Sequence, residues 1–237
     1  MTRRGVRGAF FQDQPEFDRR HQFKRRDTPP TSRLLFRIGL IALLLGSTLG
    51  NGAWGREPLE VYTDAANFQN NGILELAVQE WERFLIEFPD HELSLKARYY
   101  LGVSYFQLKT YDQAAEAFQQ TIKQAVDIEF DLLEDAYLNL GSSQFALARA
   151  GKSEMYAQAV QTYAQLLELF PVDKGKYGDQ ALYFMGDAWY AQGNKQQAVI
   201  AYARLISEYP TSPTRADGLF ALAATFDGQA EYEKSVK

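Results

Sequence analysis

Apolar residues recur at helical spacing through most of the chain, and residues 95–122 show the pattern plainly. The apolar positions of the second half of this segment are Tyr111, Ala114, Ala115, Phe118 and Ile122. Intervals of three and four residues place such side chains on one face of an amphipathic helix. The first half presents Ala97, Leu101, Gly102 and Tyr105 in the same manner. Lys109 and Thr110 separate the halves, which predicts two antiparallel helices joined by a tight turn.

This helix pair recurs along the chain. A small residue marks each first helix, at intervals of 37 to 45 residues, and these residues are Ala65, Gly102, Gly141, Gly186 and Ala223. In the second helices an alanine is followed by an aromatic residue four positions later and, in three of them, by a proline after eight more. These positions are Ala77, Trp81 and Pro89; Ala114 and Phe118; Ala159, Tyr163 and Pro171; and Ala198, Tyr202 and Pro210. The prolines should end the second helices.

The small residues indicate close helix packing. Helix axes approach within 8–10 Å, depending on the side chains at the contact. We expect Gly102 to face Ala114 and Gly186 to face Ala198, with the aromatic residue of each second helix filling the space between units.

These positions resemble the tetratricopeptide repeat (TPR), with its leucine–glycine–aromatic first helix and alanine–aromatic–proline second helix. The resemblance covers the chain from about Leu59 to its last residue and implies an all-α fold, a right-handed α-solenoid of antiparallel helix pairs. About four and a half units are expected in residues 56–237. Their approximate bounds are 58–91, 95–128, 134–173, 179–212 and 216–237. Residues 84–91 (FLIEFPDH) are similar to exported bacterial members, among them the Tol-Pal-associated division coordinator and BamD-like lipoproteins.

Two units depart from the pattern. Six extra residues separate Gly141 from Ala159, which predicts a longer turn near residues 149–156. The last unit leaves only about six residues for its second helix before Lys237. The sequence is therefore either a fragment of a longer array or one whose last unit a partner covers, because arrays normally end in a polar capping helix.

The amino-terminal residues predict export. Residues 1–37 carry ten Lys and Arg against four Asp and Glu, so the net charge of −5 divides into +6 there and −11 in the remainder. A basic leader, expected to be disordered over residues 1–33, precedes an apolar segment within residues 34–55. This order is typical of a secretory signal peptide, cleaved near residue 55, or of an uncleaved anchor. Both alternatives leave the repeats outside the cytoplasmic membrane, either periplasmic or anchored and facing outward.

Little in the chain suggests catalysis or a cofactor. There is no cysteine, and neither His21 nor His91 has partners at ligand or triad spacing. Gly151, Lys152 and Ser153 lack the earlier glycine of a phosphate-binding loop. The acids at 127, 129, 131, 134 and 135 lack calcium-loop spacing and suit a helix amino terminus. We therefore expect no enzyme, no metal and no cofactor, and the acidic body disfavours nucleic acid.

The predicted function is protein binding. First helices line the concave face of such arrays, where aromatic residues could anchor an extended peptide or a helix, or could instead pack between helices. The candidate groove residues are Tyr62, Tyr99, Phe106, Phe145, Tyr183, Tyr190 and Phe220. Lys96 is the one basic residue at these inward positions. The leading hypothesis is a scaffold for a cell-envelope protein, with no small-molecule substrate and membrane contact only through residues 34–55. Two alternatives stay open: self-association through the last unit, and a TPR region of a longer enzyme.

Overall fold

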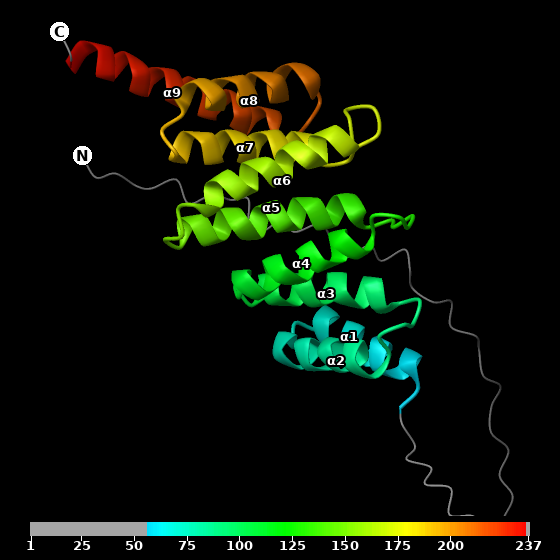
Figure 1. Cartoon of the computed structure of the whole chain (residues 1–237). Coiled ribbons are helices and arrows are strands. Elements are labelled where there is room, and N and C mark those ends of the chain that lie inside the picture. Colours follow the sequence, from blue (N-terminus) through cyan, green and yellow to red (C-terminus); the bar gives the residue numbers. More distant parts are fainter. Residues whose placement is uncertain (1–55, 236–237) are drawn as a thin grey trace, which may run out of the picture. The chain divides into compact units, whose positions relative to one another are not determined.

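A computed structural model describes residues 56–235 of the chain, with side chains as far as Phe226. Every regular element in this part is a helix (Figure 1). The helices are α1 (Pro58–Asn70), α2 (Leu74–Glu87), α3 (Ser94–Gln107), α4 (Tyr111–Gln124), α5 (Leu133–Arg149), α6 (Met155–Leu169), α7 (Gly178–Ala191), α8 (Lys195–Glu208) and α9 (Arg215–Ser235). The predicted leader and the apolar segment 34–55 lie outside the described residues. None of the described helices has the length and apolar character needed to cross a membrane.

The helices stack in chain order as antiparallel pairs, and this confirms the predicted all-α solenoid (Figure 1). Each helix packs mainly against the helix before it and the helix after it. The odd-numbered helices from α3 to α9 also contact one another in sequence, to a greater extent than the even-numbered helices do. The odd-numbered helices therefore form the inner side of the stack. We call their surface the first-helix face.

Three-residue turns close the first, second and fourth pairs. Each turn has a residue with positive φ at its centre, namely Gly72 (73°), Lys109 (63°) and Gly193 (79°). The turn of the third pair, residues 150–154, is longer by two residues and contains Gly151. The remaining extra residues of this pair lengthen α5 and α6.

Three second helices end in the same way. The residues that follow α2, α6 and α8 are Phe88, Phe170 and Tyr209, each with an extended φ between −125° and −132° and each followed by proline. A proline disfavours helical conformation in the residue before it, so the helix ends there. The second pair lacks this proline, and α4 is followed by an eight-residue connection, residues 125–132.

The last unit differs from the expectation. A short second helix was expected before Lys237, but α9 is one continuous helix of 21 residues. A turn would have required a second helix long enough to pack back on the first, and about six residues are too few for this. The helix continues through Gly228 instead.

The glycines of the first helices pack against aromatic rings. A Cβ atom added to Gly102, Gly141 or Gly186 would lie 2.4–2.8 Å from a ring carbon of Phe118, Tyr163 or Tyr202. The nearest neighbours of these glycines are therefore rings, and the expected facing of Gly102 by Ala114 and of Gly186 by Ala198 stays a prediction. The alanines are fully buried, but the ring one turn later needs the space above the glycine.

The residue after each glycine matches the polarity of that ring. Tyr202 donates a 2.6 Å hydrogen bond to Asp187, and the Tyr163 hydroxyl lies 3.4 Å from Ser142 Oγ. Phe118 has no hydroxyl, and the residue after Gly102 is Val103. In the first pair, Trp81 Nε1 donates to the buried Gln69 at 2.8 Å. A buried polar group without a partner would cost about 1–3 kcal/mol, so these matches stabilise each pair.

Candidate protein-binding surface

The repeat-signature residues of the second helices are structural. The side chains of Trp81, Phe118, Tyr163 and Tyr202 are at most 2% exposed. Each core cluster is shared by one helix pair and the first helix of the next pair. These side chains therefore fix the positions of successive first helices and are not available to a partner.

Three of the predicted groove residues are also buried. Tyr99, Phe106 and Phe145 are each 6% exposed. Phe106 packs edge-on against Tyr111, and Phe145 packs edge-on against Tyr156. In the isolated chain these three side chains therefore pack between helices, which was the alternative to a binding role.

The other four predicted residues are more accessible. Tyr62 is partly buried and packs edge-on against Trp81, with ring centroids 4.8 Å apart. Tyr183 is partly buried beside Phe184. Tyr190 on α7 and Phe220 on α9 are 45% and 68% exposed. The accessible aromatic surface of the first-helix face therefore lies towards α7 and α9.

Carboxylates accompany these aromatic residues. Asp187 lies one turn before Tyr190, and burial raises its pKa above the ordinary value against the effects of the Tyr202 hydrogen bond and the charge of Arg149. Burial, and then the charges of Asp187 and Asp217, raise the pKa of Tyr183 to about 12. The three groups are therefore close enough to interact, and Tyr183 keeps its proton at neutral pH.

A second group of polar residues lies where α3, α5 and α7 approach one another. Asp135 is buried in the first turn of α5, and its Oδ1 accepts a 2.8 Å hydrogen bond from the Tyr177 hydroxyl. Its Oδ2 is buried and has no hydrogen-bond partner among the described residues. Burial, and then the charge of Asp135, raise the pKa of Tyr99 well above its ordinary value. Lys96 of α3 forms an ion pair of 3.1 Å with Asp131 in the connection before α5.

The other residues that the sequence raised as candidates for chemistry make contacts that stabilise the fold. His91 Nδ1 accepts a hydrogen bond from the Leu93 amide, and its ring packs edge-on against Phe84. Lys152, in the turn between α5 and α6, pairs with Asp112 at 2.5 Å. Within residues 56–226, no group of three His, Asp or Glu side chains is arranged to hold a metal ion. His21 lies outside the described residues.

Bonds between successive units were missed by the sequence reasoning. Glu134 Oε1 accepts from the amides of Lys176 and Tyr177, at 2.5 and 2.8 Å, so α5 holds the connection before α7. Asp179 of α7 accepts from the hydroxyls of Ser212 and Thr214 in the connection before α9. The only signal in the sequence was an acid in the first turn of a first helix. That signal fits a helix-dipole effect equally well.

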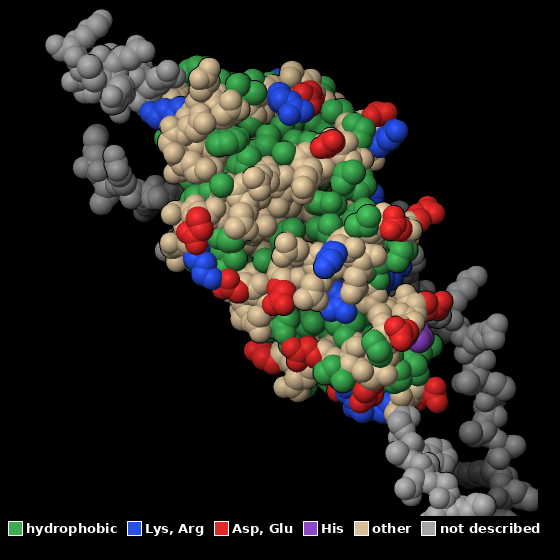
Figure 2. Space-filling model, viewed as in Figure 1, with side chains coloured by type: hydrophobic (Ala, Val, Ile, Leu, Met, Phe, Trp, Pro, Cys, Tyr) green, Lys and Arg blue, Asp and Glu red, His purple; other side chains and the backbone are tan. Residues whose placement is uncertain are grey.

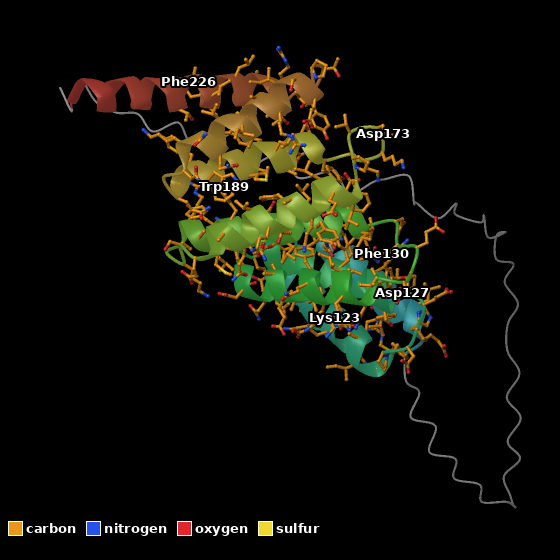
Figure 3. All side chains as sticks on the ribbon, turned by 45° about the horizontal axis from the view of Figure 1, so that its top comes forward. Lys123, Asp127, Phe130, Asp173, Trp189 and Phe226 are labelled. Atoms are coloured by element: carbon orange, nitrogen blue, oxygen red, sulfur yellow. The ribbon has the colours of Figure 1, made fainter. Side chains whose placement is uncertain are left out.

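Figure 2 shows one side of the helix stack, where hydrophobic side chains gather between isolated charged ones. Figure 3 labels residues of two connections and of three helices, among them Lys123 at the end of α4. Asp127 and Phe130 belong to the connection after α4, Asp173 to the connection after α6, Trp189 to α7 and Phe226 to α9. The labelled charged residues of the connections and the labelled aromatic residues of α7 and α9 therefore belong to different elements of the fold.

Comparisons with known proteins agree with this architecture. Two family profiles described as tetratricopeptide repeat match residues 62–126, and residues 135–171 and 180–212, together more than half of the chain. No curated protein sequence matches. Among solved structures, MamA superposes with a TM-score of 0.59 at 17% identity, over 76% of this chain and 86% of MamA. A Podosopora anserina protein with nearly identical TPR-like repeats gives 0.58 at 16% identity, over 76% and 91% of the two chains. A tetratricopeptide repeat protein from Parabacteroides merdae gives 0.58 at 17% identity, over 75% and 63%. At these identities the structures support the fold alone.

Proposed function

Because the chain belongs to the tetratricopeptide-repeat family, whose members are generally non-catalytic scaffolds, we propose that it is an exported scaffold that binds a cell-envelope protein on its first-helix face. The observation that carries the proposal is the exposure of Tyr190 and Phe220 on neighbouring helices of that face. Aromatic side chains bury a large area at a small cost in conformational entropy and often anchor interfaces.

Capture of the native partner tests the binding role. Crosslinking in intact cells followed by mass spectrometry identifies neighbours of the wild-type chain. Replacing Tyr190 and Phe220 by serine should reduce recovery of the principal partner about tenfold or more, which is the range for anchoring aromatic residues. The matched control replaces Ile86 and Ile200, exposed apolar residues of α2 and α8, by serine. Equal recovery with both double variants, at unchanged helical circular dichroism, would contradict the proposal.

The proposed location rests on the basic leader and the apolar segment of residues 34–55. Protease added to intact cells should leave the repeats undigested, and digestion should follow permeabilisation of the outer membrane alone. Deletion of residues 34–55 should keep the chain in the cytoplasm. The mass of the mature chain then decides between a cleaved signal and an anchor. Repeats that resist protease until the inner membrane is lysed would contradict export.

Self-association is a second candidate, favoured by one observation. Leu219, Phe220 and Phe226 are exposed apolar residues of α9. Exposed apolar side chains of this size are common at protein interfaces. Light scattering over a hundredfold range of concentration tests it, because association should raise the apparent mass and replacement of Phe226 by serine should reverse the rise. A constant monomer mass would contradict it.

A further inference from the structure

The first-helix face from α5 to α9 combines carboxylates with accessible tyrosine rings. This inference rests on the proposed function. We propose that the bound segment of the partner is cationic, with Lys or Arg side chains that pack against Tyr183 and Tyr190 and lie beside Asp187 and Asp217. The segment would cross α5, α7 and α9 in an extended conformation.

Each of these three helices supplies a carboxylate. Asp135 in α5 and Asp217 in α9 occupy the same register, six residues before Gly141 and Ala223. Asp187 in α7 directly follows Gly186. The equivalent of Asp135 in α3 is Lys96, whose charge is already paired with Asp131. Arg149 at the end of α5 acts on Asp187 through its charge, which lowers the pKa of that carboxyl. A segment crossing α5, α7 and α9 would therefore meet the carboxylates of Asp187 and Asp217, whereas that of Asp135 is buried in α5.

Two carboxylate oxygens on this face have unused hydrogen-bonding capacity. Tyr202 bonds only Oδ1 of Asp187, and no described side chain bonds Oδ2. Oδ2 of Asp135, in a side chain about nine-tenths buried, also has no partner. A carboxylate accepts up to four hydrogen bonds, and the strongest come from guanidinium and ammonium groups. Oδ2 of Asp187, in a partly exposed side chain, thus favours a donor supplied by the bound segment, whereas Oδ2 of Asp135 is buried and out of reach of that segment.

The aromatic rings favour the same ligand chemistry. Tyr183 and Tyr190 both lie near enough to Tyr202 to raise its pKa, and Tyr202 in turn contacts Asp187. Rings that face a cation stabilise it electrostatically, and most strongly when the contact is desolvated. An acidic segment would instead lie against Asp187 and Asp217, and the net charge of −11 outside residues 1–37 would oppose its approach.

Binding of labelled peptides to the full chain tests this inference. Three twelve-residue peptides of glycine and serine carry Arg, Gln or Glu at every third position, and fluorescence anisotropy measures their Kd. The Arg peptide should bind about tenfold or more tightly than the Gln peptide, with an affinity that falls as salt rises. The Glu peptide should not bind. Equal binding of the Arg and Gln peptides would overturn the inference.

Paired variants locate the site. The double change Asp187→Asn with Asp217→Asn should weaken the Arg peptide about tenfold, because both carboxylates would be lost. The control Asp127→Asn with Asp173→Asn removes the same charge from the connections marked in Figure 3 and should change Kd less than twofold. Asn at position 187 still accepts from Tyr202, so the fold should persist. If both double variants weaken binding of the Arg peptide equally, the effect is one of net charge, and the proposed site is wrong.

The same experiments separate this inference from the proposed function. If the Tyr190 and Phe220 variants lose the native partner while the crosslinked segment of that partner is neutral or acidic, the scaffold role stands and the cationic segment is wrong. If partner recovery does not depend on these aromatic residues, the proposed function itself fails.

Discussion

Lys109 is the only described residue other than glycine with a positive φ. Its counterparts in the first and fourth pairs, Gly72 and Gly193, adopt this conformation without a Cβ penalty. We predict that Lys109→Gly raises the free energy of unfolding by about 1 kcal/mol, because a side chain in the left-handed region costs roughly 1–2 kcal/mol. Urea denaturation followed by circular dichroism measures the change. Gly193→Ala is the reciprocal variant and should lower stability by a similar amount. A destabilised Lys109→Gly chain would show that the lysine side chain contributes more than its backbone costs.

Among single residues, the sequence predicted helix faces better than contacts. The spacing identified Gly102, Gly141 and Gly186 as positions of close approach, and the structure has rings above all three. Periodicity specifies which residues share a face, but the partner depends on how far one helix is shifted along the other. That shift is set by packing in three dimensions, so the spacing alone did not show that a ring would be the nearest neighbour of each glycine.

Bonds between helix pairs act at the scale of the element. Glu134 joins α5 to the connection before α7 through two backbone amides. Glu134→Ala should lower the free energy of unfolding by about 1–3 kcal/mol, because it leaves partly buried amides without their acceptor. Hydrogen exchange should accelerate at Lys176 and Tyr177. Glu129→Ala, an exposed residue of the connection after α4, is the control and should change stability by about 0.5 kcal/mol or less. Unchanged exchange at both amides would show that the connection is held by its apolar contacts.

The helices themselves were largely predictable, and the connections were not. Proline fixes the ends of α2, α6 and α8 through local backbone sterics, which a sequence displays directly. The contacts of Glu134 and Asp179 span 33 to 43 residues, and a local pattern carries no trace of them. The buried state of Tyr99, Phe106 and Phe145 also depends on neighbouring units. The sequence therefore assigned the candidate surface to the first helices, but it did not show which of the candidate residues are accessible.

At the scale of the whole molecule, the principal contacts among the described helices join neighbouring units. The core cluster around Phe84 includes residues of α1 to α3 and none of α5 to α9. Phe84→Ala should remove about 3–5 kcal/mol of local stability and accelerate hydrogen exchange in α1 to α4, while α7 and α8 keep their protection. Leu205→Ala, in a fully buried position of α8, is the mirror control and should affect α7 to α9 instead. Exchange that accelerates uniformly from α1 to α9 in either variant would show a single cooperative unit.

In each of three units, the residue after the first-helix glycine matches the polarity of the second-helix ring. This feature has a consequence for how such an array can gain units. Ser142 with Tyr163, and Asp187 with Tyr202, both lie inside one unit, so duplication of the corresponding gene segment would copy both members together. The partners of Glu134 are in the connection to the next unit, and a copy inserted before that connection would separate them. A new unit would thus inherit a compatible interior at once, whereas the joints on either side of it would have to be selected afterwards.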